Sequence, residues 1–85
     1  MDTAALLVER GKTHGDYTDH ATITQALKFC AKDGKNWHSN PPVVKEALEM
    51  IFHKIGRILS GDPDFRDHWD DIAGYAKLVA DRCSK

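Results

Sequence analysis

Hydrophobic positions recur at the three- and four-residue spacing of amphipathic helices along most of this 85-residue chain, and no stretch alternates as a strand would. The pattern predicts a short helix over 1–10 and longer helices over about 17–32, 41–60 and 63–82. Only Gly61 and Asp62 separate the last two, so they must fold back on each other as an antiparallel hairpin. We therefore expect one all-α domain over 1–85, a small bundle of three to four helices.

Each of the longer helices has an apolar stripe that should face the core. These stripes are Ile23, Ala26, Leu27 and Cys30 in the first, Val44, Leu48, Ile51, Ile55, Ile58 and Leu59 in the second, and Phe65, Trp69, Ile72, Ala73, Ala76, Val79 and Ala80 in the third. Trp37 lies in a polar loop between helices. We expect it to cover the edge of the core rather than to stack on a ligand.

Short polar residues and glycines mark the expected ends of the helices. The expected N-caps are Asp2 or Thr3, Asp16 or Thr18, Asn40 and Asp62. Pro41 and Pro63 follow the last two, at the first helical position that proline favours. The expected stops of the first three helices are Gly11, Gly34 and Gly61. For Asp16, capping and a functional role are both open.

The composition, 41% hydrophobic and 29% charged, is that of a soluble domain. A net charge of -1 argues against general nucleic-acid binding, because such binding depends on many cationic contacts to phosphate. The longest early apolar run, Ala4 to Val8, is too short for a membrane span or a signal peptide. We therefore expect no membrane partner and a cytoplasmic location, in the host cytoplasm if the protein is viral.

The small size of the chain also bears on its core. Because 85 residues bury only a modest core, a helical chain of this length often completes it as a homo-oligomer. Cys30 and Cys83 have neither metal nor redox spacing, and both fall on apolar helix faces. We expect them to be buried free thiols.

Carboxylates crowd the last two helices, although helix interiors do not favour aspartate. Residues three or four positions apart share a helix face, and the hairpin should bring the acidic faces together. Converging carboxylates suit a hard cation such as Mg²⁺, which prefers oxygen ligands. Gly74, on the same face, would let another helix or a ligand approach closely. The candidate metal ligands are Glu46, Glu49, Asp67, Asp70 and Asp71.

Cationic side chains should lie beside these acids. Lys54 and Arg57 would meet the phosphates of a nucleotide, where metal and cations stabilise the charge that develops as a phosphoanhydride is cleaved. An alternative explanation is structural, with Arg57 paired to Asp67 or Asp71 across the hairpin; each exposed pair would add about 1 kcal/mol or less. The other candidate ligand-binding residues are His14, Asp16, Tyr17, His53 and His68.

A family resemblance rests on three motifs, His14-Gly15-Asp16-Tyr17, Lys54-Ile55-Gly56-Arg57 and Asp67-His68-Trp69-Asp70-Asp71-Ile72-Ala73-Gly74-Tyr75-Ala76. Together they resemble small phage-encoded helical domains of unknown function, similar in pattern to the nucleotide-modification-associated phage domains. More distantly, the last two helices resemble the MazG-like all-α nucleoside triphosphate pyrophosphatases. The matching acidic positions of that pattern are Glu46, Glu49, Asp67 and Asp70, while Lys45 stands where a leading glutamate belongs.

The resemblance implies a nucleotide-directed domain that binds a nucleoside phosphate with Mg²⁺ and could hydrolyse it to a monophosphate and pyrophosphate. Lysine at position 45 favours a different hypothesis, a non-enzymatic phage accessory protein. Such a protein would bind a host protein or sequester a nucleotide signal, as a defence or host-takeover inhibitor. A third hypothesis is that the polar cluster is structural, in which case Asp67→Ala should destabilise the fold strongly.

Overall fold

Four helices joined by short turns make up residues 2–85, the part of the chain that the computed structural model describes. They are α1 (Thr3–His14), α2 (Tyr17–Ala31), α3 (Pro42–Ser60) and α4 (Arg66–Ala80). No residue from 2 to 85 is in a strand, so the predicted all-α bundle is confirmed. Within the same residues, no helix combines the length and the hydropathy that crossing a membrane requires.

Local capping sets the starts of α1 and α2. The Asp2 carboxylate accepts a hydrogen bond from the Ala5 amide at 2.7 Å. The Asp16 carboxylate accepts one from the Asp19 amide at 3.2 Å. Each bond satisfies an amide that has no partner within its helix, so both aspartates are the N-caps that the sequence predicts.

The end of α1 differs from the prediction. Gly11 does not stop the helix, which continues for one more turn to His14. Gly15 ends it instead, because its φ of 80° takes the chain out of the helical conformation. A glycine inside a helix is tolerated at modest cost, whereas positive φ strongly favours glycine.

The starts of α3 and α4 also differ from the prediction. Pro41, not Asn40, is the N-cap of α3, and no side chain caps that end. The helix α4 begins later than expected, with Phe65 as its N-cap. The Asp62 carboxylate accepts a hydrogen bond from the Asp64 amide at 2.9 Å. This turn holds the carboxylate outside the helix, so Asp62 cannot cap α4.

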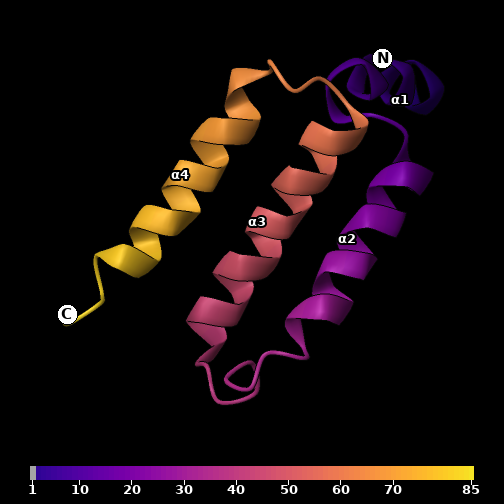
Figure 1. Cartoon of the computed structure of the whole chain (residues 1–85). Coiled ribbons are helices and arrows are strands. Elements are labelled where there is room, and N and C mark those ends of the chain that lie inside the picture. Colours follow the sequence, from indigo (N-terminus) through magenta and orange to yellow (C-terminus); the bar gives the residue numbers. More distant parts are fainter. Residues whose placement is uncertain (1) are drawn as a thin grey trace.

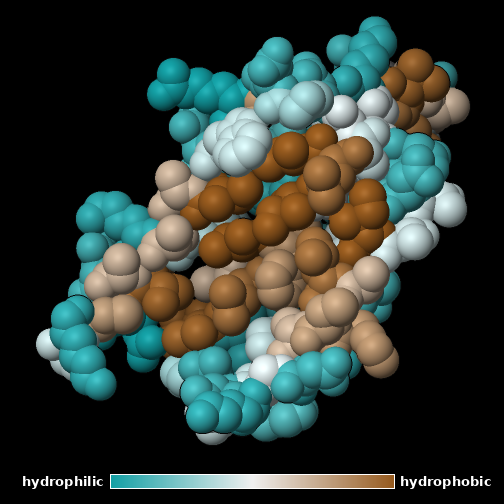
Figure 2. Space-filling model, viewed as in Figure 1, coloured by the Kyte–Doolittle hydropathy of each residue, from teal (hydrophilic) through white to brown (hydrophobic). Residues whose placement is uncertain are grey.

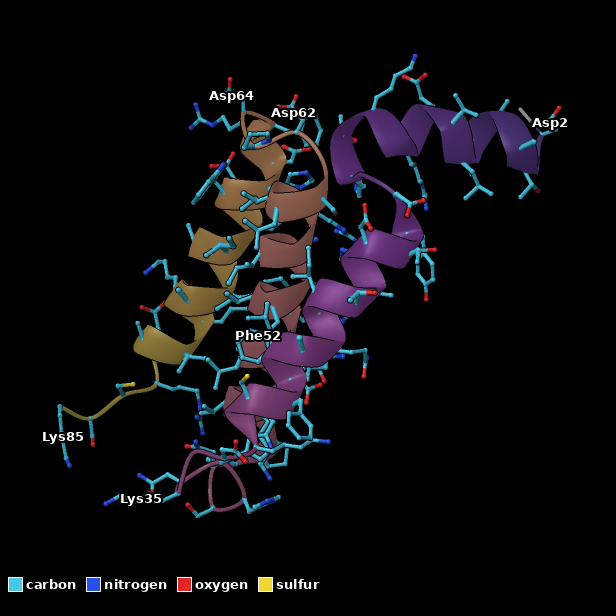
Figure 3. The ribbon with its side chains drawn as sticks, turned by 45° about the vertical axis from the view of Figure 1, so that its right-hand side comes forward. Asp2, Lys35, Phe52, Asp62, Asp64 and Lys85 are labelled. Atoms are coloured by element: carbon cyan, nitrogen blue, oxygen red, sulfur yellow. The ribbon has the colours of Figure 1, made fainter. Side chains whose placement is uncertain are left out.

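The helices α2, α3 and α4 lie side by side in a single layer, with α3 in the middle and both neighbours antiparallel to it (Figure 1). The helix α1 lies across one end of this layer and projects beyond it (Figure 3). It contacts α2 and α3 but contributes no buried side chain. The molecule is therefore elongated, with extents of 45 × 25 × 22 Å.

Two tight turns meet where α1 ends and the chain passes from α3 to α4, a region that we call the turn junction. The Asp62 amide donates to the Thr13 carbonyl at 3.0 Å, and His68 Nε2 donates to the same carbonyl at 2.8 Å. Gly15 lies so close that a Cβ there would overlap the Ser60 carbonyl. Figure 3 shows Asp62 beside the end of α1. The junction thus fixes α1 against the hairpin.

Few side chains are buried in this single layer. Among the apolar residues from 2 to 85, only Trp37 and Ala47 are buried, and the burial of Trp37 is consistent with its predicted place at the edge of the core. Every member of the three predicted core stripes is half-buried or exposed, because no second layer covers the side that carries them. Cys30 and Cys83 are exposed, contrary to the prediction. Cys30 belongs to the apolar stripe of α2, which no second layer covers, and Cys83 lies beyond the end of α4.

Candidate functional site

A cleft of about 590 Å³ opens where α1 crosses the ends of α2 and α3. Its volume is within the range of small-molecule sites in proteins. The second half of α1, the turn before α2, the start of α2 and the later part of α3 form its walls. The lining residues are Leu7, Arg10, Gly11, His14, Gly15, Asp16, Tyr17, His20, His53 and Arg57.

The cleft unites most of the residues that the sequence predicts as ligand-binding. Sequence reasoning missed Leu7, Arg10 and His20. Helical spacing could have found two of them, because Arg10 is four residues before His14 and His20 is four after Asp16. Five of the seven predicted residues line the cleft, namely His14, Asp16, Tyr17, His53 and Arg57.

Two histidines stack in the wall of the cleft. The rings of His20 and His53 are 26° from parallel, and His20 Nε2 lies 3.4 Å from His53 Nδ1. The Thr24 hydroxyl is 3.5 Å from the same His20 nitrogen. His20 Nδ1 is buried and has no hydrogen-bond partner among residues 2–85. It lies against Gly56, where a Cβ would come within 2.9 Å of it, so glycine is what allows this approach of α2 to α3.

His14 connects the cleft to the turn junction. Its Nδ1 lies 2.6 Å from the hydroxyl of the neighbouring Thr13. Its ring meets the buried ring of His68 edge-on, with centroids 5.1 Å apart. These two contacts hold the imidazole in place at the edge of the cleft.

Burial lowers the pKa of His14, His20 and His53 below the ordinary value of 6.5. Neighbouring cations, among them Arg57 in each case, lower the pKa of these rings further, because they oppose a second positive charge. All three rings are therefore neutral near pH 7. A neutral imidazole offers one donor and one acceptor nitrogen.

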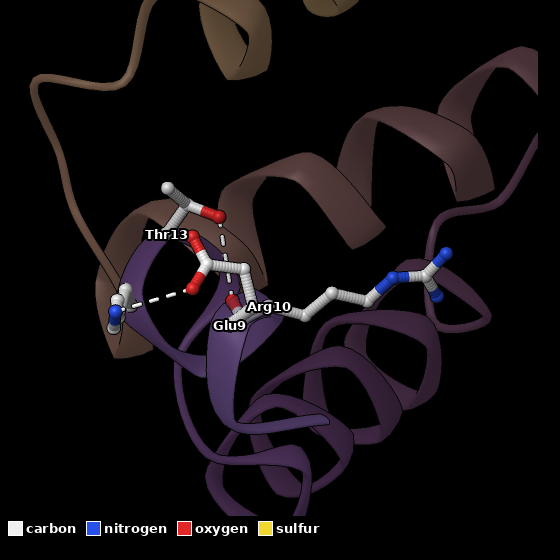
Figure 4. Close-up of polar contacts among 4 residues, drawn as sticks. Glu9, Arg10 and Thr13 are labelled. Carbon is white, nitrogen blue, oxygen red and sulfur yellow. Dashed lines mark hydrogen bonds and ion pairs between the residues drawn. The ribbon is translucent and has the colours of Figure 1, made fainter. Parts of the chain in front are cut away.

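Two guanidinium groups give the cleft its charge. Neither Arg10 nor Arg57 has an ion-pair partner within residues 2–85. Glu9, beside Arg10 in sequence, pairs with Lys12 at 3.1 Å instead, and the Arg10 side chain extends away from it (Figure 4). Asp16 is the one carboxylate among the lining residues, and it already caps α2. The cleft is therefore cationic at neutral pH.

Lys54 and His68, also predicted to bind ligand, do not line the cleft and have structural partners. Lys54 Nζ pairs with the Asp71 carboxylate at 3.0 Å, and the lysine side chain is only 9% exposed. His68 is 1% exposed. Its Nε2 carries a hydrogen, because its partner is the Thr13 carbonyl, which can only accept.

The five carboxylates predicted to hold Mg²⁺ are not gathered into one cluster in residues 2–85. No three His, Cys, Asp or Glu side chains in the described part of the chain could hold a metal ion together. Asp70 pairs with Arg66 of its own helix at 3.1 Å, and Asp71 pairs with Lys54. Glu49 borders a separate hollow that is also lined by Lys28 of α2 and by Lys32, which follows that helix. As placed, these residues do not fit a magnesium centre.

Three expectations about the hairpin are also revised. Arg57 pairs with neither Asp67 nor Asp71: Lys54 holds Asp71, and Arg57 lines the cleft beside α1 and α2. Asp67 is exposed and has no ion-pair partner in residues 2–85, so its removal should not destabilise the fold strongly. No other helix of residues 2–85 approaches Gly74 closely, since a Cβ there would meet nothing within 4 Å.

No family model matches the chain, and no curated protein or solved structure is significantly similar to it. The resemblance to phage helical domains and to MazG-like pyrophosphatases therefore stays a prediction that rests on its three motifs. The cytoplasmic location stays a prediction as well.

Proposed function

We propose that this chain binds a nucleoside phosphate in the cleft between α1, α2 and α3. The observation that supports this most is that Arg10 and Arg57 line one cleft without carboxylate partners in residues 2–85. A guanidinium is permanently charged and presents a planar set of donors that suits phosphate oxygens. The Asp16 carboxylate already caps the N-terminus of α2 in the same wall, so the attraction for an anion comes from the two guanidinium groups.

The base of a bound nucleotide would contact the apolar rim of the cleft. Tyr17, at the start of α2, is 77% exposed, and Leu7 of α1 is 64% exposed. An aromatic ring can stack on a base, and an aliphatic side chain adds dispersion contact. We therefore assign the phosphates to Arg10 and Arg57 and the base to Tyr17 and Leu7.

The proposal is for binding rather than hydrolysis. The resemblance to MazG-like pyrophosphatases implies a group of carboxylates around a metal, and no three His, Cys, Asp or Glu side chains in residues 2–85 could hold one together. Binding without turnover is what a nucleotide-sequestering accessory protein would do. Of the hypotheses drawn from the sequence, this one fits the geometry of the cleft best.

Arg57→Ala should weaken the binding of a nucleoside triphosphate about tenfold or more, because a hydrogen bond to a charged group contributes roughly 1.5–3 kcal/mol. Isothermal titration calorimetry in buffer that contains EDTA measures this affinity without a metal. Arg66→Ala is the matched control, since Arg66 is an exposed arginine of α4 that pairs with Asp70 and does not line the cleft. It should bind like the wild type.

Two outcomes would contradict this proposal. Wild-type affinity in both Arg10→Ala and Arg57→Ala would show that the cleft does not hold the phosphates. Release of pyrophosphate from the wild type with Mg²⁺ would show that the chain is an enzyme after all. Abolition of that release in Arg57→Ala but not in Arg66→Ala would assign the activity to the same cleft.

The affinity of the cleft for anions should rise as the pH falls below about 6.5. In the free protein, the lowered pKa of His14, His20 and His53 delays protonation to below that value. A bound anion favours the protonated rings, so binding takes up protons. The stability of the fold depends on pH in the opposite direction. The unfolded chain keeps the ordinary pKa and binds these protons first, so stability is present above about pH 6.5 and is lost as the pH falls.

Thermal melting between about pH 7.5 and pH 5.5, with and without a nucleoside triphosphate, tests both pH dependences. The melting temperature of the free protein should fall towards low pH, while the increase caused by ligand should grow. A terminal phosphate itself takes up a proton near pH 6, so sulfate, whose charge stays constant, is the control ligand. An increase that is the same at every pH would contradict the role of the histidines.

A further inference from the structure

The apolar stripe of α3 faces the side of the layer that lies between α2 and α4. Lys54 pairs with Asp71 of α4, whereas Gly56 lies against Thr24 of α2. Ile55 lies between these two positions, about 100° around the helix from each, so it faces neither neighbour directly. The same side of α3 carries Val44, Leu48, Ile51, Ile58 and Leu59.

The neighbouring helices extend this surface. On α4, Trp69, Ala73 and Ala76 follow one line of the helix, opposite the line of Asp71 and Leu78. Figure 2 shows a broad apolar area that spans the layer. On α2, the corresponding residues are Ile23, Ala26, Leu27 and Cys30. We call these residues, together with the α3 stripe, the apolar face. Each of its members is half-buried or exposed, and none is charged.

The surface area of the whole chain, with its projecting α1, exceeds that of a compact monomer. Its accessible surface is 6215 Å², whereas a compact monomer of 9.5 kDa exposes about 5,050 Å². Its radius of gyration is 14.6 Å, against about 12 Å for a compact domain of this length. The excess area is about 1,200 Å² per chain. Two chains that each buried this excess would share an interface of about 2,400 Å², the size typical of obligate homodimers.

We propose that a second copy of this chain covers the apolar face. Only two apolar side chains are buried in residues 2–85, so the fold depends on a partner that is present whenever the chain folds. A second copy of the chain always meets this condition. An uncharged apolar face matches itself about a two-fold axis. The net charge of -1 adds little repulsion between copies. The product is two layers of three helices that share one hydrophobic core.

The proposed interface leaves the cleft open. His53 and Arg57 are each two residues from Ile55, which places them on roughly the opposite side of α3. Both line the cleft. Dimerisation through the apolar face and ligand binding in the cleft can therefore be measured, and can fail, independently.

Sedimentation equilibrium and thermal melting over about a hundredfold range of protein concentration test the proposal. The wild type should have twice the chain mass of 9.5 kDa, and its melting temperature should rise with concentration. Leu59→Glu should shift the mass to that of one chain and lower the melting temperature at equal concentration. Leu59 is 65% exposed in the single chain, so a charge there is tolerated in a monomer and penalised only under a partner.

Leu78→Glu is the matched control, because Leu78 is 66% exposed but lies on the opposite line of α4. It should keep the wild-type mass and melting temperature. A wild type with the mass of one chain and a melting temperature independent of concentration would overturn the proposal, and so would a mass above two chains. Dissociation of Leu78→Glu without dissociation of Leu59→Glu would reject this face as the interface. The wild-type measurements decide the question even if Leu59→Glu does not fold.

Discussion

Alanine at Gly15 is expected to lower the free energy of unfolding by about 3 kcal/mol or more. Gly15 has φ 80° and ψ -176°, a conformation essentially restricted to glycine. A Cβ on Gly15 would also overlap the backbone of Ser60. The two turns cannot separate without loosening the hydrogen bond from the Asp62 amide to the Thr13 carbonyl. Backbone strain and loss of the turn junction therefore act together.

Thermal unfolding at a fixed protein concentration measures this effect, and a fall of about 10 °C or more is expected. Gly74→Ala is the matched control. A Cβ at Gly74 meets nothing within 4 Å, and alanine is favoured over glycine inside a helix by about 0.5–1 kcal/mol. The control should be as stable as the wild type or slightly more stable. Equal stabilities of the Gly15→Ala and Gly74→Ala variants would refute the role assigned to the turn junction.

The second large effect is expected from His68→Ala, which should destabilise the fold by about 3 kcal/mol. The His68 ring is 1% exposed and lies edge-on to Phe65 and His14, with centroids 5.0 Å and 5.1 Å away. Its removal opens a cavity in the turn junction and deletes the hydrogen bond to the Thr13 carbonyl. That carbonyl still accepts from the Asp62 amide, so the cavity is the larger part of the loss.

Two further variants separate these contributions in the same denaturation experiment. His68→Phe keeps an aromatic ring, somewhat larger than imidazole, but cannot donate, so it should lose less stability than His68→Ala. His38→Ala removes an exposed histidine from the loop before α3 and should change stability by less than about 0.5 kcal/mol. Equal losses in the two His68 variants would assign the stabilisation to the hydrogen bond instead of the packing. Wild-type stability in both would contradict a structural role for His68.

The helices themselves were largely predictable, because their determinants are local. The caps Asp2 and Asp16 act on amides three residues away, and the apolar spacing of each helix is visible in the sequence. Two of the errors occur where a distant segment intervenes. Asp62 does not cap α4 because it lies in a turn where its own amide donates a hydrogen bond to the Thr13 carbonyl. Gly15, rather than Gly11, ends α1 because the chain at Gly15 must pass close to Ser60.

The candidate site was predictable only in part, for a similar reason. The motif that contains His14, Asp16 and Tyr17 does line a cleft with Arg57, as a site built from these residues requires. The helix that completes the cleft is α1, whose Arg10 belongs to no motif in the sequence. Helical spacing indicates which residues share a face, but it does not indicate which helix that face meets.

The sequence by itself determined that this chain is helical, where its helices lie and which side of each is apolar, because these properties depend on residues within about one helical turn. Only the tertiary structure decided that Lys54 rather than Arg57 holds Asp71, that no three carboxylates of residues 2–85 could hold a metal together, and that apolar residues of three helices are left uncovered. Each of these outcomes depends on how whole helices are placed against one another. That placement is set by long-range packing, and above all by the junction where Gly15 meets the turn after α3.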